Sequence, residues 1–178
     1  MNVRLRPATA DDARSIAEVQ VAAWRTTYRD IIDAGYLASM DAEERAARWE
    51  RWFGAADIER RSLLVAVEAE RGVIGFAAAG PERSCDDECA GELYAIYLLA
   101  ERQRYGIGAR LFGASAAALH AVGMRTMLVW VLRDNPGRGF YHRMNGTETR
   151  EQSTTIGGRE YAEIGFSWRL PLADAAAA

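Results

Sequence analysis

Cysteine and histidine are scarce in this sequence of 178 residues, which contains two of each. Cys85 and Cys89 lie four residues apart, and only His120 and His142 could join them around a metal ion. A structural zinc site needs four ligands at a recognisable spacing, and that pattern is missing. We therefore predict no metal site and interpret the cysteines as reduced thiols in a polar loop.

The sequence also lacks an excess of positive charge and long hydrophobic runs. Its formal net charge is -3 and its pI is near 5.5, so it has no general attraction for phosphate backbones and we expect no nucleic-acid partner. No stretch approaches the ~18 apolar residues of a membrane span, and residues 1–7 contain arginines but no apolar signal-peptide core. We expect a cytoplasmic protein with no membrane partner.

What remains is an ordinary globular composition, with 49% hydrophobic and 26% charged residues. Thr9 followed by Asp12 predicts a helix start, and Gly72 and the pair Gly157-Gly158 predict turns between strands. Apolar periodicity predicts strands at 3–6, 63–68, 73–80, 91–99, 127–132, 147–156 and 159–170, and helices at 9–28, 41–53, 107–122 and 136–144. The strand, helix and strand within 91–132 predict a right-handed crossover between parallel strands, in one mixed-sheet domain.

The segment 103–111 is the most informative about function, because it lies between an extended run and a helix. Gly106 and Gly108 allow backbone amides to approach a ligand, and the helix start adds unpaired N–H groups and a positive dipole end. An anionic pyrophosphate would fit there, with charge-assisted bonds from Arg102 and Arg104. A G-x-G is equally consistent with a tight turn, and the P-loop and three-glycine dinucleotide patterns are absent.

These residues resemble the acetyl-coenzyme A loop of the GCN5-related N-acetyltransferase superfamily, Q/R-x-x-G-x-G/A, which Gln103, Gly106 and Gly108 match. Residues 134–141 resemble the N-x-x-x-x-F-Y segment of that superfamily, 91–98 its central cofactor strand, and 22–31 its bacterial small-molecule members. Residues 142–147 depart from the E-K-L-G-F that often follows F-Y, and Gly146 is expected to end the helix there.

The resemblance implies an α/β (α+β) fold with a mixed, mostly antiparallel central sheet of about seven strands flanked by helices. It implies a single N-acetyltransferase domain over residues 1–172, and the alanine-rich tail 173–178 is expected to be disordered. In relatives a bulge splays the two central parallel strands, so that backbone groups of 94–98 contact the cofactor arm. A homodimer formed through the late apolar strands is also plausible by resemblance.

Acetyl-coenzyme A is the cofactor that the resemblance implies. Asn135 resembles the asparagine that bonds the cofactor arm, although Asn-Pro is also a common pair at a helix entry. The expected cofactor-binding residues are Ile96, Tyr97, Leu98, Gln103, Arg104, Tyr105, Gly106, Ile107, Gly108, Ala109, Asn135 and Tyr141.

Two residues are candidates for acid-base catalysis. A free amine with a pKa near ~10.4 is mostly protonated at neutral pH, so a base assists its attack on a thioester. Glu92, eleven residues before Gln103, is spaced like the catalytic glutamate of histone-acetylating relatives; otherwise it is an exposed strand glutamate. Tyr141 is the candidate acid that protonates the departing thiolate, or else an aromatic that packs against the cofactor.

Trp24, Tyr28 and Tyr94 are the candidate walls of a substrate pocket, and all three could equally belong to the core. The prediction is thus an enzyme that transfers an acetyl group from acetyl-coenzyme A to a primary amine of a small molecule or peptide by direct attack in a ternary complex. A catalytically silent module that binds coenzyme A is the alternative. The identity of the amine does not follow from the residues.

Overall fold

The computed structural model describes residues 2–83 and 90–172. Cys85, Cys89 and the tail 173–178 lie outside the described residues, so the predictions made for them stay predictions. The helices are α1 (Ala13–Thr27), α2 (Ala34–Ser39), α3 (Ala42–Trp52), α4 (Ile107–Ala121) and α5 (Arg138–Arg143). The strands are β1 (Val3–Pro7), β2 (Ser62–Glu68), β3 (Gly72–Pro81), β4 (Gly91–Leu98), β5 (Thr126–Leu132), β6 (Thr147–Ile156) and β7 (Arg159–Arg169).

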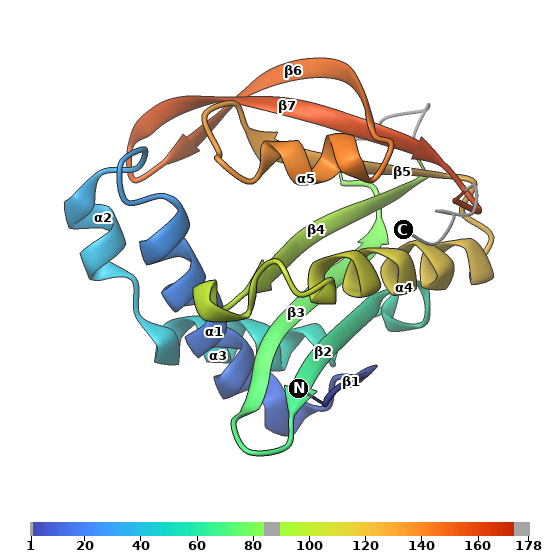
Figure 1. The fold of residues 1–178 in the computed structure, drawn as a ribbon, viewed down its shortest axis with the longest axis horizontal. Coiled ribbons are helices and arrows are strands. Elements are labelled where there is room, and N and C mark those ends of the chain that lie inside the picture. Colours follow the sequence, from blue (N-terminus) through green and yellow to red (C-terminus); the bar gives the residue numbers. More distant parts are fainter. Residues whose placement is uncertain (1, 84–89, 173–178) are drawn as a thin grey trace.

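The strands form one mixed sheet in the order β1-β2-β3-β4-β5-β7-β6. Every neighbouring pair is antiparallel except β4 and β5, which are parallel and joined through α4. Helices α1 and α3 cover one face, and α4 and α5 cover the other (Figure 1). The predicted seven-stranded mixed sheet, and the crossover within it, are confirmed.

Local sequence signals explain most of the element boundaries. The carboxylate of Asp12 accepts a hydrogen bond from the Thr9 amide at 2.8 Å, but it closes a short 3₁₀ turn, after which α1 begins at Ala13. Asp41 caps α3 by accepting from the Glu43 amide at 2.7 Å. The turns at Gly72 and at Gly157-Gly158 have the positive φ that glycine permits.

Helix α2 was missed by the sequence analysis because it has only six residues and shows no periodicity. Its first turn is capped by Asp33, whose carboxylate accepts from the Tyr36 amide at 3.0 Å. Its last carbonyls are bound by Arg25 of α1, which donates to Leu37 O at 3.1 Å and to Met40 O at 2.9 Å. The helix therefore depends on a tertiary contact that no local pattern reveals.

The end of α5 differs from the expectation. Asn145, with φ of 60°, takes the left-handed position, and Gly146 follows it. The Gly146 amide donates to Tyr141 O at 3.0 Å, as at a helix C-terminus. A Cβ on Gly146 would lie 2.4 Å from the Trp168 ring, so glycine is required here by packing rather than by φ.

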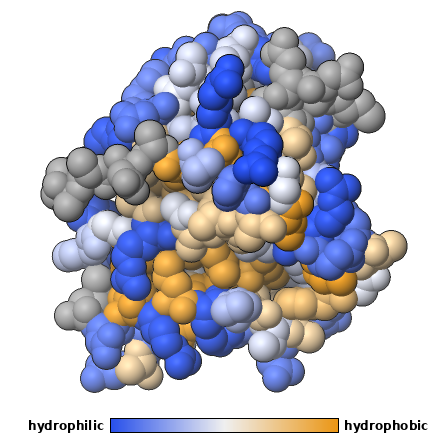
Figure 2. Space-filling view, turned by 90° about the vertical axis from the view of Figure 1, so that its right-hand side faces the viewer, coloured by the Kyte–Doolittle hydropathy of each residue, from blue (hydrophilic) through white to orange (hydrophobic). Residues whose placement is uncertain are grey.

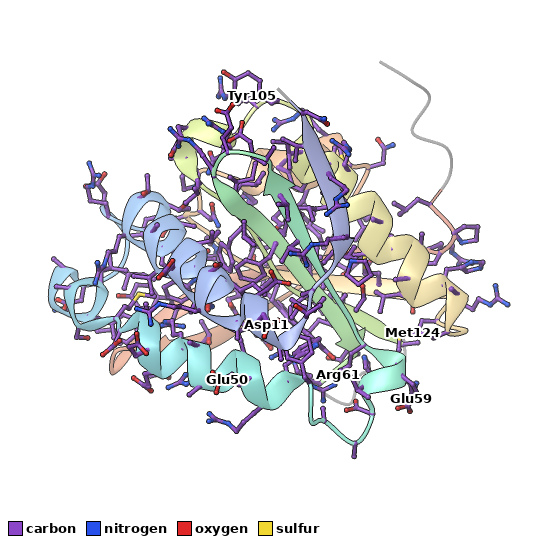
Figure 3. All side chains as sticks on the ribbon, turned by 90° about the horizontal axis from the view of Figure 1, so that it is seen from below. Asp11, Glu50, Glu59, Arg61, Tyr105 and Met124 are labelled. Carbon is purple, nitrogen blue, oxygen red and sulfur yellow. The ribbon has the colours of Figure 1, made fainter. Side chains whose placement is uncertain are left out.

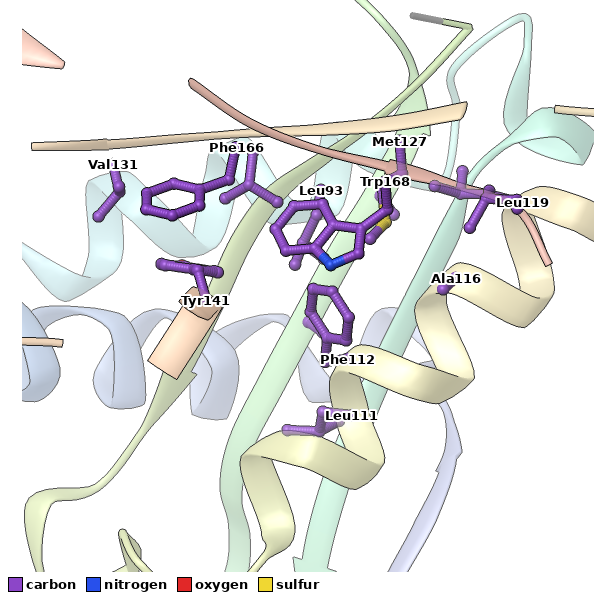
Figure 4. Close-up of a cluster of buried hydrophobic side chains, with 14 of the residues drawn as sticks. Leu93, Leu111, Phe112, Ala116, Leu119, Met127, Val131, Tyr141, Phe166 and Trp168 are labelled. Carbon is purple, nitrogen blue, oxygen red and sulfur yellow. The ribbon is translucent and has the colours of Figure 1, made fainter. Parts of the chain in front are cut away.

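Aromatic rings fill the core between the sheet and α4 (Figure 4). Phe112 of α4 lies edge-on to Trp168 of β7, with ring centroids 5.0 Å apart. Tyr141 of α5 packs against Phe166 of β7 at 5.5 Å. These contacts fix α5 on the sheet and so determine where Tyr141 lies.

The last strand of the sheet is more polar than expected. β6 is an edge strand with the sequence Thr-Glu-Thr-Arg-Glu-Gln-Ser-Thr-Thr-Ile, and most of its residues are exposed. Among the described residues, the exposed large hydrophobic side chains are those of Ile58, Tyr105 and Val122. Figure 2 shows apolar residues gathering in the lower half of the face at which α4 ends, between polar side chains. The exposed side chains of β6 are therefore mostly polar, and the predicted homodimer stays a prediction.

Candidate functional site

The parallel strands β4 and β5 part soon after they begin. Their register contains two residue pairs, Gly91 with Met127 and Glu92 with Leu128. Beyond these pairs β5 stays with β7 and β4 stays with β3. In the described part of the chain, the edge of β4 that faces β5 has no strand partner over residues 93–98. Its backbone groups are thus open to an extended ligand.

A β-bulge lies where the strands part. Ala78 of β3 pairs with Ala95 and Ala79 pairs with Leu93, which makes Tyr94 the extra residue. Leu93 packs on the α4 side of the sheet, whereas Tyr94 and Ala95 both pack toward α1 and α3. The bulge thus directs an additional side chain to the face opposite α4.

The loop after β4 leads into the start of α4. Arg104 and Gly106 have positive φ values of 66° and 76°. The first helical bond runs from Arg110 N to Gly106 O at 3.1 Å. Within the described residues no backbone or side-chain acceptor is bonded to the amides of residues 106–109. Four amides at the positive end of a 15-residue helix are therefore free for an anionic group, and a diphosphate fits this loop.

The two glycines of the loop differ in their reason for being glycine. A Cβ on Gly106 would meet nothing within 4 Å, so its positive φ is what favours glycine there. A Cβ on Gly108 would lie 3.5 Å from the side chains of Leu98 and Phe140, an ordinary contact distance. A side chain as small as alanine would therefore fit at Gly108, and neither φ nor packing within the described residues requires glycine there.

The arginines of this loop have different roles. Arg102 is paired with Glu68 at 2.9 Å, and both side chains are largely buried. Three of its N–H donors are used within the protein, two on Glu68 and one on the Glu101 carbonyl, so phosphate binding by Arg102 stays a prediction. Arg104 is exposed and has no ion-pair partner within the described chain, so its guanidinium is free to meet a phosphate.

The other predicted cofactor residues surround this loop. Gln103 donates to Leu98 O at 3.4 Å. Tyr105 is 66% exposed and projects at one end of the sheet (Figure 3). Ile107 is buried, and Ala109 is partly exposed in the first turn of the helix. Ile107 can therefore offer a ligand only its backbone.

Side chains along β4 divide between the two faces. Ile96 and Leu98 pack on the α4 side, while Tyr97 packs on the α1 side with Phe76 at a ring distance of 5.6 Å. A ligand along the open edge of β4 would therefore contact its backbone, with these side chains above and below.

Three phenols converge beside the point where the sheet splits. Burial raises the pKa of Tyr141, and the neighbouring Tyr97 raises it further. Burial likewise raises the pKa of Tyr28, with added contributions from Tyr97 and Tyr141. These mutual effects on the pKa values indicate that residues 28, 97 and 141 lie close together, although they are far apart in sequence. All three phenols are protonated donors at neutral pH.

Asn135 is used within the protein. Its amide Nδ2 donates to the Tyr28 hydroxyl at 3.1 Å, and its Oδ1 accepts from the Gly137 amide at 2.7 Å. Asn135 thus ties the turn before α5 to the end of α1, and it orients Tyr28. The structural function considered for the Asn-Pro pair is present, and contact with the cofactor stays a prediction.

Glu92 is buried and strongly paired. Its carboxylate is 3% exposed and accepts from the Nε of Arg83 at 3.0 Å, from its Nη2, and from its backbone amide at 3.2 Å. The alternative of an exposed strand glutamate is wrong. Three donors of Arg83 thus occupy the Glu92 carboxylate, so an incoming amine reaches it only when Arg83 moves or through a bridging water.

Tyr94 is held on the face opposite α4. Its hydroxyl donates to Pro81 O, Arg83 lies 4.3 Å from its ring centroid, and burial raises its pKa to about 12. Gly80 makes this position available, since a Cβ there would lie 2.6 Å from the Tyr94 hydroxyl.

Two adjoining cavities open on this face. The first, of about 300 Å³, lies where the sheet splits; we call it the split cavity, and its lining includes Tyr28, Glu92, Tyr97, Trp130, Leu132 and Glu163. The second, of about 470 Å³, lies between α1, α3 and β4; we call it the arginine cavity, and its lining includes Trp24, Arg45, Arg48, Arg51, Arg61 and Arg83.

The predicted substrate residues all reach these cavities. Trp24 and Tyr94 line both of them, and Tyr28 lines the split cavity. Trp24 also carries a buried indole N–H that has no hydrogen-bond acceptor among the described residues. The sequence analysis missed Trp130 and all of the lining arginines. Arginines on a helix are usually solvated, and no local signal distinguishes those that line a cavity.

Two kinds of feature are absent from the described residues. No helix there is both long enough and apolar enough to cross a bilayer. No three or more histidine, cysteine, aspartate or glutamate residues are grouped there so as to hold a metal ion.

Comparisons with known proteins agree with this geometry. The sequence profile of the FR47-like protein family matches residues 77–155, which span β4, the glycine loop and α5. The chain is 38% identical over 166 residues to the Bacillus subtilis (strain 168) protein named uncharacterized N-acetyltransferase YuaI, covering 93% of this chain and 92% of that one.

Solved structures share the fold. The PaiA N-acetyltransferase of Thermoplasma acidophilum, in complex with coenzyme A, superposes with a TM-score of 0.76 at 20% identity, over 95% of this chain and 99% of that one. The structure of yncA from Salmonella typhimurium, a putative acetyltransferase with acetyl-CoA, gives a TM-score of 0.71 at 22% identity, over 98% and 96%.

Proposed function

The chain belongs to the GCN5-related N-acetyltransferase superfamily as an acetyl-CoA-dependent acyltransferase, and we propose that it acetylates a primary amine of a small molecule or peptide by direct attack in a ternary complex. The observation that carries the proposal is the split between β4 and β5. It lies between the free amides at 106–109 on one side and the split cavity on the other. Donor and acceptor can thus enter from opposite faces and meet beside β4.

The residues of the loop and strand would hold the donor. The amides of 106–109 and the guanidinium of Arg104 bind its phosphates, and the open edge of β4 over 93–98 binds the extended arm. Acetyl-coenzyme A supplies an activated acetyl thioester, whose C–S bond breaks as the new C–N bond forms. Tyr105 stands exposed beside the phosphate end.

Tyr141 donates its phenolic proton to the departing sulfur. Its raised pKa keeps the proton in place at neutral pH, so the acid form is always available. A phenol with a high pKa transfers a proton to a thiolate only over a short, well-oriented path, which its packing between Phe140 and Phe166 provides. The proton that the amine loses to its base passes on through solvent and restores Tyr141, so the transfer is balanced in protons.

Glu92 remains the proposed base. The donors of Arg83 occupy its carboxylate, so a proton from the amine reaches it when Arg83 shifts or through a bridging water. The ion pair between Arg83 and Glu92 also favours the second candidate function, a catalytically silent module that binds coenzyme A. If Arg83 never releases the Glu92 carboxylate, Glu92 does not take the proton of the amine and does not assist its attack.

The test is a screen of amine acceptors with acetyl-coenzyme A and detection of the released thiol. The sequence contains no lysine, so transfer to the protein's own side-chain amines does not obscure the signal. Turnover of any acceptor rejects the silent module. Coenzyme binding that raises the melting temperature, with no turnover across the screen, rejects the enzyme.

The variant Tyr141→Phe tests whether the Tyr141 hydroxyl supplies the proton to the departing sulfur. The substitution removes one hydroxyl from a packed ring, so we expect kcat to fall about 10²-fold while the melting shift given by acetyl-coenzyme A is unchanged. Tyr161→Phe is the matched control, because Tyr161 lies on β7 in the cluster around α2 and outside the residues placed at the split. Equal kcat values for both variants would remove Tyr141 from the proton path.

We also propose a location, a partner and a mode of dimerisation. We place the enzyme in the cytoplasm with a small-molecule partner, and we propose that any homodimer uses the exposed edge of β6 through main-chain hydrogen bonds rather than apolar packing. Light scattering after size exclusion measures the oligomeric state directly.

A further inference from the structure

The arginine cavity concentrates positive charge in a chain whose formal net charge is -3. Five arginines line it, and its described lining contains no aspartate or glutamate. Like charges that share a hollow repel one another, and the repulsion grows as water is excluded. Such a lining is complementary to an anion.

Carboxylates near the cavity neutralise only part of this charge. Arg48, Arg61 and Arg83 each pair with one carboxylate. Arg45 and Arg51, both on α3, have no ion-pair partner within the described residues. Two positive charges are therefore left over at the wall that α3 contributes.

Aromatic walls hold the guanidinium groups in place. The Arg45 guanidinium lies 5.4 Å from the centroid of the Trp24 ring, and that of Arg83 lies 4.3 Å from the centroid of Tyr94. Stacking engages the face of a guanidinium and leaves the N–H donors at its edge free. These edge donors match the spacing of carboxylate and phosphate oxygens.

The cavity is continuous with the acceptor side of the acetylation site. Trp24, Arg83, Tyr94 and Tyr97 line both the arginine cavity and the split cavity. It is separate from the phosphate loop, because Tyr105 of that loop and Arg61 lie toward opposite ends of the molecule in Figure 3. A volume of about 470 Å³ suits a small organic molecule.

We propose that the acceptor is a small amine that also carries an oxyanion, a carboxylate or a phosphate-type group, and that the arginine cavity binds this group while the amine lies in the split cavity. The inference rests on the proposed acetyltransferase function, which it narrows to one class of acceptor. Arg45 is the main determinant, because it is unpaired, partly buried and stacked.

The experiment compares acceptors that differ in the group opposite the amine, which is anionic in two of them and neutral in the third. 4-(Aminomethyl)benzoate, 4-(aminomethyl)benzamide and 4-(aminomethyl)phenylphosphonate share one aromatic body and one benzylic amine. Acetyl transfer to each is measured in the wild type, in Arg45→Gln and in Arg14→Gln. Arg14 is the matched control, because it lies on α1, is 68% exposed and pairs with Glu18 and Glu43 outside the cavity. Glutamine is used because a lysine would add an acceptor amine.

We expect kcat/KM for the better of the two anionic acceptors to exceed that for the amide about tenfold in the wild type and in Arg14→Gln. Arg45→Gln should abolish most of that ratio by raising KM for the anion, with KM for acetyl-coenzyme A unchanged. The carboxylate and phosphonate arms tell which oxyanion is preferred. A rise in KM for acetyl-coenzyme A would overturn the proposal, since the arginines would then serve the donor.

The two proposals fail in different ways. Equal kcat/KM for the anionic and neutral acceptors would overturn the oxyanion site while leaving the acetyltransferase standing. If no acceptor is turned over, calorimetric titration of 4-(aminomethyl)benzoate into the wild type and Arg45→Gln decides: binding that only the variant loses supports the anion site, and equal or absent binding overturns it.

Discussion

Replacing Asp12 by asparagine tests the electrostatic contact that joins the first strand to the first helix. The Asp12 carboxylate accepts two hydrogen bonds from the Arg6 guanidinium, at 2.6 Å and 2.8 Å, and one from the Thr9 amide at 2.8 Å. It is 10% exposed. The bonds from Arg6 lower its pKa from 3.8 to about 2, against an opposing contribution from burial.

The size of the effect follows from this shift. Because the pKa is lower in the folded state, the ionised carboxylate contributes stability that is complete above about pH 4 and is lost as the pH falls toward 2. The shift corresponds to about 2 kcal/mol at neutral pH. For a chain of this length, we expect Asp12→Asn to lower the melting temperature by roughly 5 °C at pH 7.

The assay is urea unfolding of the wild type and Asp12→Asn at pH 7 and at pH 3. The difference in unfolding free energy should fall from about 2 kcal/mol to about 1 kcal/mol between these values. Asp11→Asn is the control, since Asp11 is the exposed neighbour in the same turn. If Asp12→Asn costs no more than Asp11→Asn at pH 7, or if its cost does not shrink at pH 3, the reasoning from the Arg6 pair is refuted.

Two further substitutions probe glycines that shape the site. Gly106→Ala should destabilise the fold by about 1 kcal/mol, because the positive φ of Gly106 is strained for alanine although there is space for its Cβ. It should also weaken the melting shift given by acetyl-coenzyme A. The control is Gly113→Ala, in open space within α4, which should stabilise the fold by about 0.5 kcal/mol. Gly80→Ala should raise KM for the acceptor, because the added Cβ displaces the Tyr94 hydroxyl, and it should leave the coenzyme-induced melting shift unchanged. An unchanged KM for the acceptor would show that Tyr94 is not a wall of the acceptor site.

The sequence predicted those parts of the fold that local rules govern. The glycine turns, the helix predicted at 41–53 and the crossover through α4 depend on residues close together in sequence, and all were found. The end of α5 was not, because the steric demand on Gly146 comes from Trp168, more than twenty residues later. Helix α2 failed for the same reason, since Arg25 supplies its C-terminal bonds.

The candidate site likewise has one part that a contiguous sequence signal predicts and one part that residues far apart in sequence form. The donor side could be predicted because a glycine loop at a helix start is a contiguous signal, and residues 106–109 do present free amides. The acceptor side could be located only in part: Trp24, Tyr28 and Tyr94 do line cavities, but the arginines opposite them come from α3 and from the ends of β2 and β3. Nothing in their local sequence separates Arg45 from its solvated neighbours on the same helix.

Arg83 connects the lining of the acceptor cavities with the proposed chemistry. Its Nε and Nη2 hold Glu92, while its guanidinium lies over the Tyr94 ring and its side chain lines both cavities. A guanidinium has five N–H donors, so the Nη1 side of Arg83 can meet an incoming anion while Glu92 is still bound. An anion that competes for the shared guanidinium weakens its hold on the carboxylate, so Glu92 becomes open to the amine only when an acceptor of the right charge is present. Specificity for an oxyanion and activation of Glu92 would then have one physical origin.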